Sequence, residues 1–143
     1  MRVPSERMTS RNRAVLAAVA SDVAAVFVFV LLGRRSHDSG QGLAAILGTA
    51  APFLVALAVG WVVVLALRLA PLDVLTGVVL WAITAVGGLV LRRTAWARGT
   101  APAFIVVTLV AIGLLFVGWR SILGFTRGRG GISSSTPPSK AGL

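Results

Sequence analysis

Four long apolar stretches, separated by short polar segments, constrain the fold of this chain more than any other feature. They cover residues 14–33, 51–69, 74–91 and 101–119. Each would extend about 27 to 30 Å as an α-helix, which matches a hydrocarbon core about 30 Å thick. Lipid offers no partner to backbone N–H and C=O groups, and these stretches are too long for barrel strands. The sequence therefore predicts an all-α, polytopic membrane protein with a bundle of four transmembrane helices.

The segments outside the predicted spans define the domain organisation. A basic N-terminal tail, residues 1–13, precedes a transmembrane domain that covers residues 14–120. Because the first apolar run ends without a small-residue cleavage site, we interpret it as an uncleaved signal anchor. Residues 43–50 are also apolar, and we expect an interfacial or re-entrant segment there. Residues 121–143 are rich in Gly, Ser and Pro, which predicts a disordered C-terminal tail.

The residue types available for chemistry are few. The chain has no cysteine, no tyrosine, one histidine and four acidic residues, which excludes thiolate chemistry and leaves little for general acid–base catalysis. The net charge is +10, but the basic residues form short clusters beside apolar stretches instead of one contiguous face. We therefore expect no enzyme, no cofactor, no metal site and no nucleic-acid partner.

The distribution of basic residues predicts an orientation. Nine of them lie in the N-terminal tail, the second loop and the C-terminal tail, and five lie in the first and third loops. The positive-inside rule therefore favours both termini on the cytoplasmic side. The numbers of basic residues that flank the second and third spans, taken alone, favour the opposite orientation. Insertion in both orientations therefore stays an alternative.

Asp22 is an acidic residue inside the first predicted span. An ionised carboxylate at the centre of a span costs at least about 2.5 to 3.5 kcal/mol, so something must compensate it. One interpretation is a proton or cation site in the bundle interior. The alternative is a structural residue near the headgroups, or one hydrogen-bonded to Ser21, Thr49 or a neighbouring helix.

The most polar segment follows the first span. Arg34, Arg35, Ser36 and His37 are candidates for a site that binds an anion or a lipid headgroup, because guanidinium and hydroxyl groups suit phosphate. The alternative is a positively charged flank followed by a polar turn.

Small residues recur at a spacing of four within the spans. Examples are Ala56 with Gly60 in the second span and Thr84 with Gly88 in the third. This spacing places each pair on one helix face and allows close helix packing. We expect these faces to build the bundle or a homo-oligomer.

Several short motifs resemble those of a known family. They are Asp22 in the first span, Phe-Val-Leu-Leu-Gly-Arg-Arg-Ser-His at 29–37, Pro-Phe-Leu-Val at 52–55, Gly60-Trp61, Gly-Val-Val-Leu-Trp at 77–81 and Gly-Trp-Arg at 118–120. Together they are similar to a bacterial family of small four-span membrane proteins known as a domain of unknown function. The resemblance covers residues 21–120 and implies a multi-pass protein of the bacterial cytoplasmic membrane. It implies no activity, ligand or catalytic residue.

Two functional hypotheses follow from these residues. The first is a small transporter-like protein, oligomeric because four spans hardly enclose a pathway, in which Asp22 couples to a proton or cation. The second is a non-catalytic accessory protein that binds anionic lipid or a larger membrane partner through its arginine clusters.

Overall fold

The computed structural model describes residues 4–35, 42–95 and 101–129, and the regular structure there is entirely α-helical. The helices are α1 (Pro4–Arg35), α2 (Leu43–Ala66), α3 (Val74–Thr94) and α4 (Pro102–Arg129). Each contains a segment that is long and apolar enough to cross a membrane. The protein is therefore an all-α, four-span membrane protein, as the apolar stretches predict.

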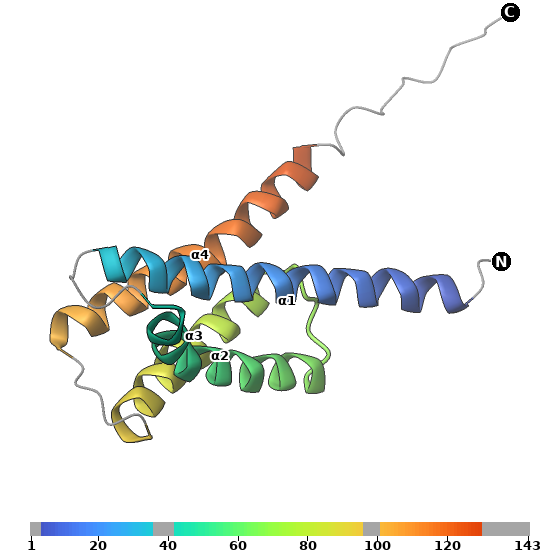
Figure 1. Ribbon diagram of the computed structural model, residues 1–143. Helices are drawn as coiled ribbons and strands as arrows, with labels where there is room; N and C mark the ends of the chain where they lie inside the picture. The colour runs from blue at the N-terminus through green and yellow to red at the C-terminus, as the bar shows by residue number, and fades with distance from the viewer. Residues whose placement is uncertain (1–3, 36–41, 96–100, 130–143) are drawn as a thin grey trace, which may run out of the picture.

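The four helices form a closed ring in which each contacts two neighbours. The contacting pairs are α1 with α2, α2 with α3, α3 with α4, and α4 with α1. The interface between α2 and α3 is the most extensive, and the one between α1 and α4 is the smallest. Figure 1 shows α1 beginning well beyond the loop that joins α2 to α3, and α4 rising away from the other helices toward its end. The first and last helices thus close the ring through a short region of contact.

Aromatic side chains and close helix approach build the core. The rings of Phe29 in α1 and Phe53 in α2 meet edge to face with centroids 5.3 Å apart. Gly60 and Gly88 lie at the α2–α3 interface, where a Cβ on Gly60 would lie 3.0 Å from Leu80 and one on Gly88 would collide with the Phe53 ring. The predicted role of these small residues in building the bundle is confirmed.

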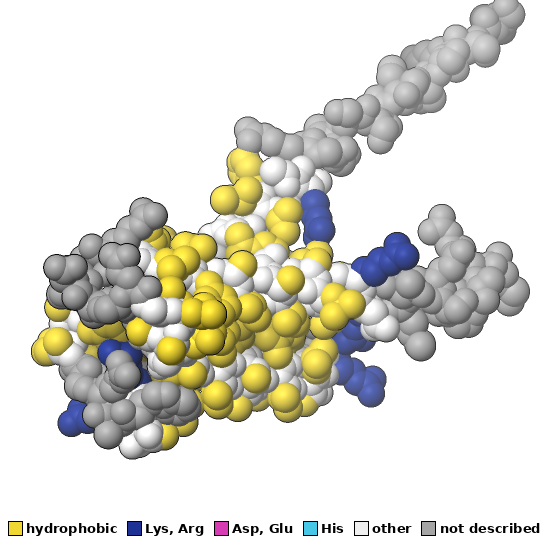
Figure 2. Space-filling model, in the orientation of Figure 1, with side chains coloured by type: hydrophobic (Ala, Val, Ile, Leu, Met, Phe, Trp, Pro, Cys, Tyr) yellow, Lys and Arg dark blue, Asp and Glu magenta, His cyan; other side chains and the backbone are white. Residues whose placement is uncertain are grey.

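The outer surface of the ring is apolar. Large hydrophobic side chains of every helix are exposed, among them Leu16, Val62, Val86 and Leu114. Figure 2 shows them covering the middle of the visible face, with basic side chains toward its two ends. This pattern fits a surface that faces lipid between two charged interfaces.

Two predicted boundaries are wrong. Residues 43–50 form the first turns of α2 and are not a separate interfacial or re-entrant segment, because a continuous helix satisfies backbone groups in lipid and tolerates the internal Pro52. Residues 121–129 belong to α4 and are not part of a disordered tail, because the apolar pattern resumes after Arg120 with Ile122 and Leu123. Residues 130–143 lie outside the described part of the chain. The basic N-terminal segment is helical from Pro4 onward.

Candidate functional site

Asp22 lies near the middle of the apolar segment Ser10–Gly33 of α1. Its side chain is completely buried. A carboxylate withdrawn from water in this way requires an opposite charge and hydrogen-bond donors. The site is therefore defined by what surrounds Asp22.

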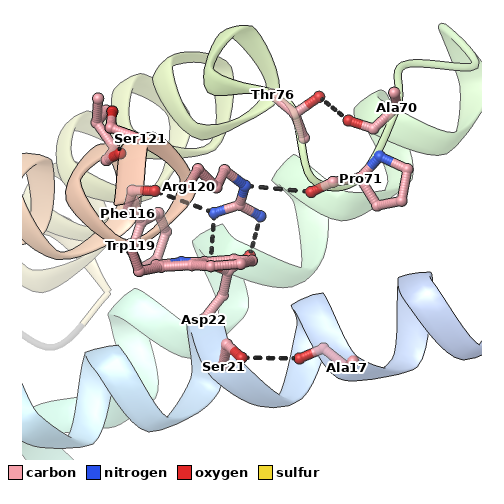
Figure 3. A network of polar contacts seen from close by, with 11 residues as sticks. Ala17, Ser21, Asp22, Ala70, Pro71, Thr76, Phe116, Trp119, Arg120 and Ser121 are labelled. Carbon is pink, nitrogen blue, oxygen red and sulfur yellow. Dashed lines mark hydrogen bonds and ion pairs between the residues drawn. The ribbon is translucent and has the colours of Figure 1, made fainter. Parts of the chain in front are cut away.

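Arg120 of α4 supplies the opposite charge through a bidentate ion pair. Its Nη1 donates to Oδ1 of Asp22 and its Nη2 donates to Oδ2, each at 2.8 Å. This parallel arrangement uses the planar guanidinium in its strongest geometry for a carboxylate. The Arg120 side chain is also completely buried. Figure 3 shows the two side chains meeting between α1 and α4, so the pair joins the first and last helices.

Further hydrogen bonds enclose the pair. The Nε of Arg120 donates to the Pro71 carbonyl at 3.1 Å, and its Nη1 also donates to the Phe116 carbonyl at 3.2 Å. The indole Nε1 of Trp119 donates to Oδ1 of Asp22 at 3.1 Å, and its ring lies 4.3 Å from the guanidinium carbon. Both charges are thus held by partners from α1, α4 and the α2–α3 loop, as a buried ion pair requires.

The α2–α3 loop brings the Pro71 carbonyl to Arg120. Helix α2 ends in a Schellman motif, in which the Arg68 N–H donates to Leu65 and the Leu69 N–H donates to Val64. Arg68 adopts a left-handed conformation with φ of 55°, which turns the chain back toward the bundle. Pro71 lies further along this loop, between the end of α2 and the start of α3.

Helix α3 begins close to α4 because Gly77 faces Arg120. A Cβ at this position would lie 2.9 Å from Cδ of Arg120 and 2.9 Å from the Phe116 carbonyl oxygen. The preceding turn is held by Thr76, whose Oγ1 donates to the Ala70 carbonyl at 2.6 Å. The absence of a side chain at Gly77 therefore leaves room for the stem of Arg120.

A groove of about 620 Å³ lies beside the ion pair, between the start of α1 and the end of α4. Its walls come from small residues of α1, from Leu72 in the loop, and from Trp119, Ile122 and Leu123 of α4. Arg13 of α1 and Arg127 of α4 also line it. It is therefore an apolar groove with a cationic residue on each helix.

A family model described as a protein of unknown function, DUF3054, matches residues 19–123. The chain belongs to the DUF3054 family. The predicted membership of a small four-span family of unknown function is thereby confirmed. No curated protein matches the chain, and no solved structure matches it either. The segment matched by the DUF3054 model includes Asp22, Trp119 and Arg120, so the whole ion pair lies within it.

The hydrogen bonds of Asp22 come from a neighbouring helix and not from the nearby hydroxyl groups named as alternatives. Ser21 donates to the Ala17 carbonyl of its own helix at 2.9 Å. Thr49 donates to the Ala45 carbonyl of α2, also at 2.9 Å. The sequence suggested Ser21, Thr49 or a neighbouring helix as the hydrogen-bond partner of Asp22. The structure shows that the partner is a neighbouring helix, α4.

The second candidate site falls outside the described part of the chain. Helix α1 ends at Arg35, but the side chains of Arg34 and Arg35, and all of Ser36 and His37, are not described. An anion or headgroup site there stays a prediction. Among the described residues, no group of three His, Cys, Asp or Glu side chains could hold a metal ion.

Sequence reasoning missed Arg120 as a partner of Asp22 and made it the last residue of the transmembrane domain. A signal was present, because Arg120 is followed by Ile122, Leu123 and Phe125, so the apolar stretch continues beyond it. An arginine inside a long apolar helix needs an anionic partner. Asp22 is the acidic residue within a predicted span, so the two could have been paired on charge alone.

Proposed function

We propose that this DUF3054 protein is a non-catalytic membrane protein that binds anionic lipid. The observation that carries the proposal is a group of exposed arginines at the end of the bundle where α1 begins and α4 ends. They are Arg11, Arg13, Arg68 and Arg127, and Figure 2 shows basic side chains gathered at this end. Among the described residues, none of the four forms an ion pair. Each arginine near an anionic membrane surface contributes about 1 kcal/mol of attraction.

The contacts of Asp22 favour this accessory role over the transporter hypothesis. Both carboxylate oxygens accept hydrogen bonds from Arg120. If Asp22 carried a proton or a cation, at least one of these hydrogen bonds would have to break in every transport cycle. The buried guanidinium would then lack its counter-charge, which is costly inside a protein. A structural role for the pair requires no such step.

The chain has few residues suited to catalysis. Its sequence contains no cysteine and a single histidine. The acid within the first span already has Arg120 as its partner. These features support a binding role without a chemical step.

The bacterial cytoplasmic membrane, with both termini on the cytoplasmic side, is the proposed location. The family resemblance supports the membrane, and the excess of basic residues at the tails and the α2–α3 loop supports the orientation. The exposed arginines would then face the leaflet surface that attracts polybasic segments through its anionic lipids.

Native mass spectrometry of the purified protein, equilibrated with equal amounts of phosphatidylglycerol and phosphatidylcholine, tests the proposal. We expect the retained lipid to be enriched in phosphatidylglycerol. Replacing Arg11, Arg13, Arg68 and Arg127 by Gln should remove the enrichment, whereas Arg93→Gln at the opposite end should preserve it. Retention of the two lipids in the supplied ratio by the unchanged protein would contradict the proposal.

A further inference from the structure

The groove beside the ion pair exists because α1 and α4 meet there and then diverge. Asp22 and Arg120 hold the two helices together at hydrogen-bond distance. Beyond this point toward the start of α1 and the end of α4, Figure 1 shows the two helices spreading apart. The space between them is about 620 Å³, within the range of about 300 to 1,000 Å³ typical of small-molecule sites.

The walls of the groove suit a hydrocarbon chain. On the α1 side they are made of small residues that include Ala14, Ala17 and Ser21, so the surface is shallow and largely without polar atoms. The Ser21 hydroxyl already donates a hydrogen bond to the Ala17 carbonyl. On the α4 side Ile122 is 66% exposed, so an occupant would cover apolar surface that α1 leaves open.

The cationic residues of the groove lie toward the ends of the two helices. Arg13 precedes Ser21 by about 12 Å along α1, at 1.5 Å per residue. Arg127 follows Trp119 by about the same length along α4. Both arginines are exposed and line the groove. The groove therefore combines an apolar base with a positive rim, which complements an amphiphile with an anionic head.

We infer that this groove binds one anionic phospholipid, with an acyl chain between α1 and α4 and the phosphate between Arg13 and Arg127. The inference rests on the proposed function and assigns a site to it. The ion pair beside the groove is completely buried and has its own partners, so it does not compete for the phosphate. Arginine is suited to this role because its planar fork can donate two hydrogen bonds to phosphate oxygens.

Thiol labelling in detergent micelles tests the site, because the chain has no native cysteine. Ser21→Cys places a nearly isosteric thiol in the groove. Ser121→Cys is the matched control, since Ser121 is exposed on α4 and does not line the groove. We expect phosphatidylglycerol to slow maleimide labelling of Ser21→Cys about tenfold or more. Each arginine near the phosphate should raise the affinity for the lipid about fivefold. Phosphatidylcholine should have little effect on the labelling rate of Ser21→Cys. Neither lipid should have much effect on the labelling rate of Ser121→Cys.

A second pair of variants separates the groove from the surrounding charge. Ala17→Phe fills the groove but keeps both arginines, and Ala82→Phe adds the same bulk to an exposed position of α3. We expect Ala17→Phe to lose retained phosphatidylglycerol in native mass spectra and Ala82→Phe to retain it.

The outcomes distinguish the site from the function. If phosphatidylglycerol stays enriched but neither protects Ser21→Cys nor depends on Ala17, the groove inference is overturned while lipid binding stands. If the unchanged protein shows no preference for phosphatidylglycerol, both are overturned. Protection of Ser21→Cys without added lipid in a particle containing two chains would assign the groove to a second copy and also overturn the inference.

Discussion

Asp22 and Arg120 illustrate how two costly residues become compatible with a membrane helix. Each alone would place a charge within the apolar length of its span, at a cost of about 2.5 to 3.5 kcal/mol or more. Together they satisfy each other through two hydrogen bonds of 2.8 Å, and Pro71, Phe116 and Trp119 contribute further bonds. The pair therefore specifies which face of α1 meets α4.

Breaking this pair on one side should be far more harmful than replacing both sides. Asp22→Leu or Arg120→Met alone leaves a buried charge without a partner, and each should lower the free energy of unfolding by about 3 to 5 kcal/mol. The double variant should lose much less than the sum, because no charge remains buried. Circular dichroism during titration with a denaturing detergent measures the stability of the unchanged protein, the two single variants and the double variant. Additive losses would show that the two residues act independently.

The two members of this pair differ in how well they could be predicted. Asp22 stands out because it interrupts an apolar stretch. Its partner lies 98 residues away, and at the end of a span an arginine normally marks the membrane interface. Charge alone could have suggested the pairing, but the geometry of the contact depends on how four helices are arranged around a ring, which no local pattern reveals. The groove was not predictable for the same reason, since its walls come from α1, α4 and the loop together.

At the level of the elements, the end of α2 contains local strain that a substitution can remove. Arg68 occupies the left-handed position of the Schellman motif with φ of 55°, where glycine is usual. Arg68→Gly should raise the free energy of unfolding by about 1 kcal/mol. The matched control is Leu67→Gly, which should lower it by about 0.5 to 1 kcal/mol because Leu67 has an ordinary φ of −78°. Detergent-induced unfolding measures both, and destabilisation by Arg68→Gly would contradict the account.

The contact between α3 and α4 depends on Gly77. Gly77→Ala should lower the free energy of unfolding by about 1 to 3 kcal/mol, because the new methyl group would meet backbone at Phe116 as well as the stem of Arg120. Gly118→Ala in α4 is the control, since nothing lies within 4 Å of its Cβ position. It should change stability by no more than about 1 kcal/mol. Equal stability of the two variants in thermal unfolding would argue against the close approach.

The number of helices could be predicted from the apolar stretches, but only some of their ends could: the starts of α3 and α4 were predicted to within one residue, whereas the start of α2 and the end of α4 were not. The requirement for internal backbone hydrogen bonds in lipid makes each long apolar run a helix, and this held for all four. The end of α4 was placed too early because Arg120 resembles a terminating flank. The start of α2 was placed too late because residues 43–50 were interpreted as a separate interfacial or re-entrant segment, whereas α2 begins at Leu43 and continues through Pro52.

At the scale of the whole molecule, an even number of crossings is what brings Asp22 and Arg120 together. Four spans return the chain to the side on which it began, so the start of α1 and the end of α4 lie at the same end of the bundle. The α2–α3 loop lies toward that end too, where Pro71 accepts from Arg120. The groove and the exposed arginines belong to this end. The proposals for function therefore depend on this topology.

Side-specific labelling of single cysteines in sealed membrane vesicles tests this topology most directly. Ser10→Cys at the start of the apolar segment of α1 and Thr126→Cys near the end of α4 should react with a membrane-impermeant maleimide from the same side. Thr94→Cys at the end of α3 should react only from the opposite side. Reaction of Ser10→Cys and Thr126→Cys from opposite sides would mean an odd number of crossings and would contradict the ring closed by Asp22 and Arg120.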